Sequence, residues 1–96
     1  MLIIIVRFTV KPEHLAAFNA RMRQQVHDTL NVEPGCSRFD TAAHPDDPAR
    51  ILLYEIYDDA AAFDAHLASA HFQTFNADTR DWVVSKALER WDGPWE

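Results

Sequence analysis

Two apolar runs constrain the fold most, at residues 2–6 and 51–57. The first is continuous, and only Glu55 interrupts the second. Short runs rich in branched and aromatic residues are typical of strands, and near-continuous apolar runs indicate strands that are covered on both faces. We therefore expect residues 2–10 and 50–57 to form the central strands of a sheet.

Helical periodicity fills two of the remaining segments. Pro12 suits the first turn of a helix, which is predicted to end near Asn31. Asp58 and Asp59 mark the start of a second helical region, which Ser69 should interrupt by capping a new helix. The spacing predicts an inner face for the first helix at Leu15, Phe18, Met22, Val26 and Leu30. It predicts an inner face for the last helical piece at Phe72, Phe75, Thr79, Trp82 and Val83.

The two other expected strands, residues 36–43 and 86–92, are more polar and are predicted to be edges. In the first of them Phe39 is expected on one face with Ser37 and Thr41, and Cys36 on the other with Arg38 and Asp40. A proline-braced loop at residues 44–48 joins it to the next strand, and residues 93–96 form a tail. The order β-α-β-β-α-β predicts one α+β domain over residues 1–96, a ferredoxin-like fold with a four-stranded antiparallel sheet.

Size and charge restrict the partners. A chain of 96 residues buries only about 60–65% of its unfolded surface, and the helices should leave one sheet face bare. We therefore expect a homodimer through that face. The net charge of −6 argues against binding to nucleic acid or to an anionic membrane, since both need a cationic surface.

Cys36 is the only cysteine, which excludes an internal disulfide and fits a reducing compartment. The apolar run at residues 2–6 is too short for a signal-peptide core and meets Arg7 at once. A cytoplasmic location is therefore predicted.

His66 is the side chain most suggestive of chemistry. It shares a helical face with Ala62, Phe63 and Leu67, so its ring is expected to point at the preceding strand. A pKa near 6.5 lets a histidine take up and return a proton at neutral pH. A core histidine bonded to a backbone carbonyl would show the same pattern, so the residues alone leave both interpretations open.

Three blocks carry a family resemblance: E-P-G-C-S-R-F-D at residues 33–40, D-P-A-R-I-L-L-Y-E-I-Y-D-D at residues 47–59, and A-A-F-D-A-H-L-A-S-A-H-F at residues 61–72. In order and spacing they resemble the antibiotic biosynthesis monooxygenase domain, a family of dimeric α+β barrels. Within it, the chain looks most like the cofactor-free quinol monooxygenases and the isomerase of phospho-hydroxypentanedione that processes autoinducer-2.

The resemblance implies a pocket between sheet and helices, without flavin, metal or haem. Haem-degrading relatives pair a strand asparagine with a helical tryptophan and histidine, whereas this chain has Phe8 and His66 in those regions. His66 and His71 do not share one continuous helical face, and no cysteine or carboxylate in the sequence completes a metal-ligand pattern with them. No metal site is expected.

Five further residues are predicted to contact the substrate. Tyr54 is expected to hydrogen-bond a developing enolate oxygen, although packing alone would also explain its position. Arg38 is expected to hold a phosphate or oxyanion, unless it pairs with Glu55 or Asp40. Phe8 and Phe72 are expected to line the pocket, and His71 is expected to lie at its mouth.

The resemblance implies a cofactor-independent monooxygenase that acts on a small quinol-like or oxygenated metabolite, with His66 as acid and base. Two alternatives stay open. One is a phospho-hydroxyketone isomerase, which would not consume oxygen. The other is a non-catalytic dimer that binds a small molecule and in which His66 is structural.

Overall fold

The computed structural model describes residues 1–93. The last three residues of the expected tail, 94–96, lie outside the described part. Short 3₁₀ helices at Pro12–His14 and Arg80–Trp82 precede the first long helix and the last strand. The elements are β1 (Leu2–Val10), α1 (Leu15–Val32), β2 (Cys36–His44), β3 (Asp47–Tyr57), α2 (Ala60–Ala68), α3 (Ala70–Thr79) and β4 (Val83–Asp92).

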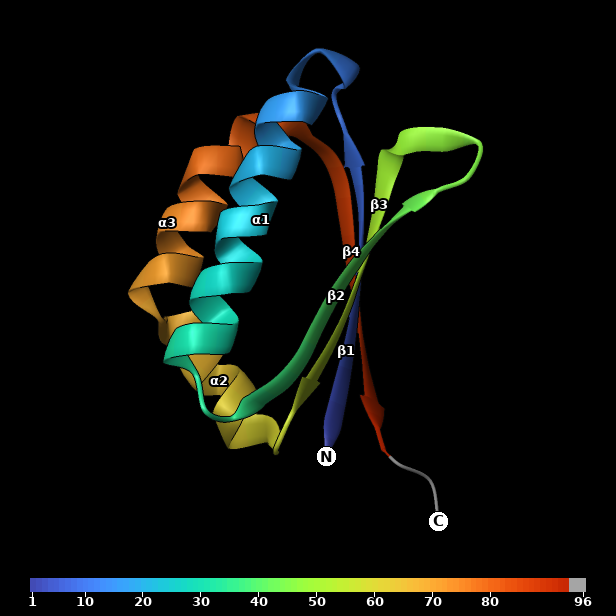
Figure 1. Ribbon diagram of the computed structural model, residues 1–96. Coiled ribbons are helices and arrows are strands. Elements are labelled where there is room, and N and C mark those ends of the chain that lie inside the picture. The colour runs from blue at the N-terminus through green and yellow to red at the C-terminus, as the bar shows by residue number, and fades with distance from the viewer. Residues whose placement is uncertain (94–96) are drawn as a thin grey trace.

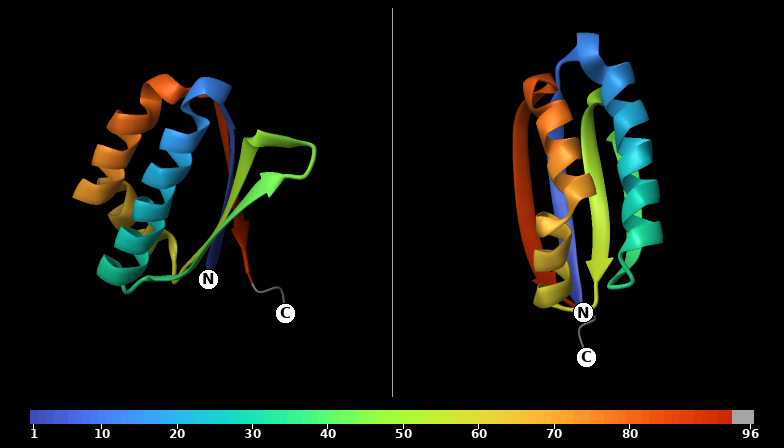
Figure 2. Two further views of the ribbon diagram at one scale, coloured as in Figure 1. Left: turned by 45° about the horizontal axis from the view of Figure 1, so that its top comes forward. Right: turned by 90° about the vertical axis from the view of Figure 1, so that its left-hand side faces the viewer.

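The four strands form one antiparallel sheet in the order β2-β3-β1-β4. All three helices lie on one face of it, and the tip of the β2–β3 hairpin bends away on the other side (Figures 1 and 2). The register pairs Val6 with Leu53 of β3 and with Leu88 of β4. The predicted ferredoxin-like α+β fold, with β1 and β3 in the centre, is confirmed.

Two strands begin earlier than predicted. β3 begins at Asp47, which pairs with His44, so most of the expected loop belongs to the hairpin. β4 begins at Val83, which pairs with Val10 and therefore does not extend a helical face. In both places pairing with a neighbouring strand extends the element beyond what the local residue pattern suggests.

The predicted alternation in β2 was wrong at its start. Cys36 pairs with Tyr57 and Arg38 with the next residue along, Ile56, so Ser37 is an extra residue in the ladder. Such a bulge changes which side chains share a face. As a result Cys36 is buried together with Phe39, rather than on the opposite side from it.

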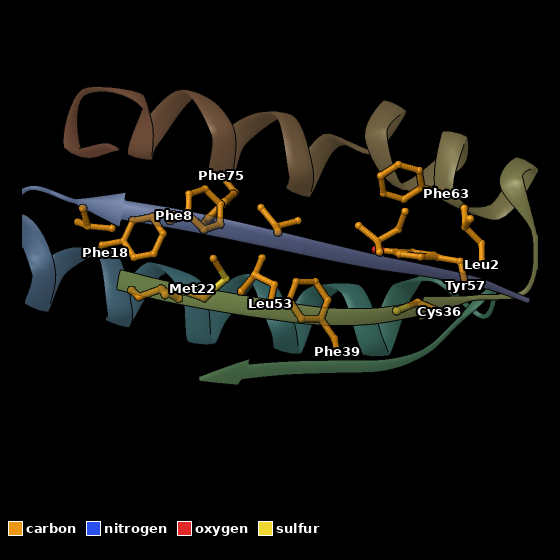
Figure 3. Packing of buried hydrophobic residues seen from close by; sticks show 14 residues of the cluster. Leu2, Phe8, Phe18, Met22, Cys36, Phe39, Leu53, Tyr57, Phe63 and Phe75 are labelled. Atoms are coloured by element: carbon orange, nitrogen blue, oxygen red, sulfur yellow. The ribbon is translucent and has the colours of Figure 1, made fainter. Parts of the chain in front are cut away.

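The core lies between the sheet and the helices (Figure 3). Phe18 of α1, Tyr57 of β3 and Phe63 of α2 are almost completely buried in it. Among residues 1–93 no helix covers the opposite sheet face, and the apolar residues of the central strands on that face are only half-buried, so in one chain these strands are fully buried on one face alone. These residues are Ile3, Ile5, Leu52, Tyr54 and Ile56. Among the described residues, no helix is long and apolar enough to cross a membrane.

Candidate active site

His66 projects from α2 into the core. Asp59 caps this helix by accepting a hydrogen bond from the Ala62 N–H at 2.8 Å, and the resulting register turns His66 inward. The residue is 3% exposed. Its ring centroid lies 5.3 Å from that of Tyr57 and 5.0 Å from that of Phe72. The prediction that His66 lies on the apolar face is confirmed.

A helix break at Ser69 brings His71 towards His66. The Ser69 hydroxyl donates to the carbonyl oxygen of His66 at 2.6 Å and accepts from the Phe72 N–H at 3.2 Å, so it ends α2 and caps α3. The centroids of the two imidazole rings are 6.0 Å apart. The predicted cap is confirmed, and the two histidines meet although they belong to different helices.

Glu33 joins the two histidines. It follows the last residue of α1, and its Oε2 lies 2.8 Å from Nδ1 of His66 and 2.5 Å from Nε2 of His71. Its side chain is 11% exposed, and Oε1 is buried with no hydrogen-bond partner within residues 1–93. The expectation that no carboxylate would join these histidines was wrong, because the fold brings together the end of α1 and the α2–α3 break.

The turn after Glu33 allows this approach. A Cβ atom at Gly35 would lie 2.7 Å from the Cβ of Ala62 in α2, which is closer than side chains pack. The carbonyl of Gly35 also accepts a hydrogen bond from the Asp58 N–H at 2.8 Å. Gly35 therefore lets the chain after α1 contact the start of α2 directly.

The environment of His66 favours the neutral ring. Burial lowers its pKa below the usual value, and the hydrogen bond and charge of Glu33 oppose this shift. A carboxylate only accepts hydrogen bonds, so the proton of the neutral ring is placed on Nδ1, facing Glu33. This leaves a lone pair on Nε2, the arrangement that a general base requires.

His66 lines a cavity of about 30 Å³ between the sheet and the helices, with room for about one water molecule. A larger ligand has to displace side chains. Gln25 also lines the cavity, and its buried amide atoms have no hydrogen-bond partner within residues 1–93. The other polar lining groups are Glu55 and Lys86, and the aromatic ones are Phe8, Phe39, Phe63, Phe72 and Phe75.

Glu55 faces this cavity from the sheet. It is 3% exposed, and its Oε1 accepts a hydrogen bond from the Tyr57 hydroxyl at 2.6 Å. Burial raises the pKa of Glu55 from 4.5 to about 7, while Tyr57 and the charge of Lys86 hold it down. In the sequence, Glu55 stands out only as the one interruption of an apolar strand. Its alternation with Leu53 and Tyr57 was the signal that places it on the helix-facing side.

Lys86 completes the polar part of the lining. Its ammonium group lies 5.4 Å from the centroid of the Phe8 ring and 5.6 Å from that of Phe72, within the range of cation–π contact. Burial lowers its pKa, and the charge of Glu55 opposes this change. In the sequence, Lys86 was only the first residue of an expected edge strand.

The predicted substrate contacts separate into two groups. Phe8 and Phe72 line the cavity, and His71 contacts Glu33 beside it. Arg38 and Tyr54 lie elsewhere: the guanidinium group stands 5.6 Å from the centroid of the Tyr54 ring, and Nε bonds Asp40 at 2.5 Å. Of the two alternatives for Arg38, the pair with Asp40 is the one formed.

Comparison with known proteins identifies the family. The model of the antibiotic biosynthesis monooxygenase family matches residues 1–78. The chain belongs to this family. The match includes the three residues of the histidine cluster, Glu33, His66 and His71, and ends before Lys86. No curated protein sequence matches the chain.

Solved structures of this family share the fold. A proposed antibiotic biosynthesis monooxygenase from Nitrosomonas europaea is 31% identical, with a TM-score of 0.93 over 99% of this chain and 100% of the other. A protein with the same proposed name from Bacteroides thetaiotaomicron is 27% identical, with a TM-score of 0.91 over 96% of this chain and 88% of the other. A third, from Caulobacter crescentus, is 17% identical, covers 98% and 90% of the two chains, and shares the fold with a TM-score of 0.93.

The arrangement provides two proton-transfer groups on opposite walls of one cavity. His66 comes from the helices with an available lone pair, and Glu55 comes from the sheet with a pKa of about 7. Burial shifts the pKa of each group towards its neutral form, and pairs of such groups in a cavity are suited to general acid–base catalysis. Glu33, His66 and His71 also place three metal-ligating atoms within 4.8 Å of one another.

Proposed function

We propose that this member of the antibiotic biosynthesis monooxygenase family is a cofactor-independent monooxygenase for a small quinol-like or oxygenated metabolite, with Nε2 of His66 as the base. One observation carries the proposal: a buried histidine lines the cavity while Glu33 holds its Nδ1 at 2.8 Å. A carboxylate that fixes the tautomer and orientation of a histidine is a recurring device for activating the other ring nitrogen.

The reaction begins with removal of a proton from a phenolic hydroxyl by His66. The phenolate passes one electron to O₂, and the phenoxyl radical and superoxide combine to form a carbon–oxygen bond. Loss of water from the resulting peroxide leaves a quinone, so one oxygen atom enters the product and the other leaves as water. The ammonium group of Lys86 is suited to stabilise the anionic oxygens, and neutral Glu55 to donate a proton to the departing hydroxide.

Isomerisation of a phospho-hydroxyketone is the second candidate. The presence of Glu55 opposite His66 favours it, since moving a proton between neighbouring carbons through an enediol uses one group to remove the proton and another to protonate the oxygen. Lys86 would then contact the phosphate or the enediol oxygen. This reaction consumes no oxygen.

Oxygen uptake separates these candidates. Purified protein is supplied with a panel of quinols and phospho-hydroxyketones, in air and anaerobically. The monooxygenase predicts oxygen consumption matched by quinone formation, and a drop of about 10²–10⁴-fold in the rate for folded His66→Gln. The exposed His27 of α1 provides a matched control, and His27→Ala should keep the wild-type rate.

Each other result supports a different conclusion. Turnover that continues without oxygen would identify the isomerase instead. Undiminished turnover in folded His66→Gln would contradict the base assigned here. A bound metabolite that is never converted would support the non-catalytic binding dimer.

We also propose that the uncovered sheet face packs against a second copy of the chain. The half-buried apolar residues of β1 and β3 on that face, among them Ile5, Leu52 and Ile56, support this dimer, because a water-exposed apolar sheet is unfavourable. A charge in the middle of the face, as in Ile5→Glu, should dissociate the dimer. Sedimentation at micromolar concentration tests this, and a monomeric wild-type mass would refute the proposal.

A further inference from the structure

In the cluster of Glu33, His66 and His71, the two carboxylate oxygens of Glu33 differ in their hydrogen bonds. Oε2 of Glu33 lies within hydrogen-bond distance of both imidazole rings, at 2.8 and 2.5 Å. Oε1 of the same carboxylate is buried and has no partner within residues 1–93. Buried carboxylate oxygens are normally satisfied, so hydrogen bonding alone leaves this cluster incomplete.

The donor atoms form a set that transition metals prefer. The three ligating atoms come from three elements, the end of α1, α2 and the start of α3, and all lie within 4.8 Å of one another. Two imidazole nitrogens and one carboxylate oxygen are the ligand types of many Zn²⁺ sites, with a further position left for water. The side chains are 4%, 13% and 11% exposed for His66, His71 and Glu33, so water competes little for the ion.

Coordination requires Glu33 to move back and the two imidazole rings, whose ligating nitrogens lie within 4.8 Å of each other, to move closer together. Ligand bonds of about 2.1 Å in tetrahedral or octahedral geometry separate neighbouring ligand atoms by roughly 3.0–3.4 Å. The present separations from Oε2 are 2.8 and 2.5 Å. A rotation of the Glu33 carboxylate away from the rings provides this space, and it lets the unpartnered Oε1 take part in coordination or accept a bond from metal-bound water.

We propose that Glu33, Nδ1 of His66 and Nε2 of His71 bind a divalent transition-metal ion, and that this ion switches off the base. In the metal-free protein Nδ1 of His66 carries the ring proton and Nε2 has the lone pair. An ion on Nδ1 forces the ring proton to Nε2, where no lone pair remains to accept a proton from a substrate. The binding stands on the cluster itself, whereas the switch rests on the proposed function of His66.

The binding is tested with Zn²⁺ alone, by titration calorimetry on untagged protein treated with a chelator. Wild type should bind about one equivalent, and Glu33→Gln should weaken the affinity at least about tenfold, since it keeps a hydrogen-bond acceptor but loses the charge. His71→Ala should weaken it similarly, while His27→Ala should have no effect. Absence of Zn²⁺ binding at 100-fold excess over protein (roughly millimolar ion), or equal affinity in all four proteins, would overturn the site.

The switch has a readout that needs no substrate. The ¹⁵N chemical shifts of His66 distinguish its two tautomers, and they should report Nδ1–H before Zn²⁺ is added and Nε2–H afterwards. A tautomer that does not change on Zn²⁺ binding would overturn the switch and leave the binding site in place. Where turnover is measurable, Zn²⁺ should inhibit wild type reversibly, and His71→Ala should need at least about tenfold more Zn²⁺ for the same fractional inhibition.

Discussion

Each wall of the cavity buries one titratable side chain, but the two side chains have different hydrogen-bond partners. On the helix wall, His66 has a carboxylate partner, Glu33, yet burial still lowers its pKa. On the strand wall, Glu55 has a hydroxyl partner, Tyr57, and burial raises its pKa to about 7. Both shifts favour the uncharged form at neutral pH. The mostly apolar cavity therefore holds two groups that can exchange protons, and burial favours the uncharged form of each.

The largest expected effect tests the strand wall by pH. The folded pKa of Glu55 is about 7 against 4.5 in the reference state, so the folded chain retains a proton that the unfolded chain releases. The contribution of Glu55 to the free energy of unfolding is fully present below pH 4.5. As the pH rises through 7, the free energy of unfolding falls by roughly 3 kcal/mol. Urea unfolding of wild type and Glu55→Gln between pH 4.5 and 8 should give curves that diverge by about this amount. Parallel curves would mean that Glu55 is ionised normally.

The second effect tests the helix wall by activity. Glu33→Gln should lower the rate at neutral pH by roughly 10–100-fold, because the amide holds the His66 tautomer less firmly. Glu33 raises the pKa of His66, so its neutralisation should also move the acid limb of the rate profile to lower pH. The half-buried carboxylate of Asp28, which accepts a hydrogen bond from Gln24, gives a control, and Asp28→Asn should leave the profile unchanged. An unshifted acid limb in Glu33→Gln would show that Glu33 does not affect the catalytic histidine.

A smaller effect concerns the hydroxyl that supports Glu55. Tyr57→Phe keeps the ring, whose centroid lies 5.1 Å from that of Phe63, and removes only the 2.6 Å hydrogen bond to Glu55. The free energy of unfolding should fall by about 1–2 kcal/mol above pH 7 and by less near pH 5, where a neutral carboxyl needs its partner less. The same loss at both pH values would indicate a packing effect instead.

The smallest effect concerns the cap that positions His71. Ser69→Ala removes the cap of α3 and should cost about 1 kcal/mol, similar to Asp59→Ala at the start of α2. Ser69→Ala should lower the Zn²⁺ affinity more than Asp59→Ala, because Ser69 forms the break that brings both histidines together, whereas Asp59 positions only His66. Thermal unfolding with and without Zn²⁺ measures both quantities. Equal Zn²⁺ stabilisation of the two variants would contradict a role of Ser69 in positioning His71.

Local patterns predicted the fold and one wall of the cavity. The apolar runs ranked the strands, and the spacing of Phe63, His66 and Leu67 placed the histidine ring inside. Glu33 was missed because it lies in a turn and reaches His66 across 33 positions of the sequence. No periodicity within a single element reports such a contact.

The errors at the strands have a different cause. Strand alternation puts Glu55 and Tyr54 on opposite faces of β3, but only the position of the helices shows which of these faces holds the pocket. The place of Lys86 in the cavity depends on the register of β4 against β1, in which Lys86 pairs with Phe8. The bulge at Ser37 likewise depends on pairing with β3 and has no clear sequence signal. Register is a property of two strands, so one strand's residues do not determine it.

Because Gly35 contacts Ala62, the loop after α1 controls how closely Glu33 approaches His66 on the helix wall. Any larger side chain at residue 35 would meet the Ala62 Cβ at 2.7 Å and would push α2 away from the end of α1. The His66–Glu33 separation would then lengthen although neither residue had changed. Substitution of Gly35, alone or together with Ala62→Gly, can therefore adjust the strength of this pairing without altering any group that faces the cavity.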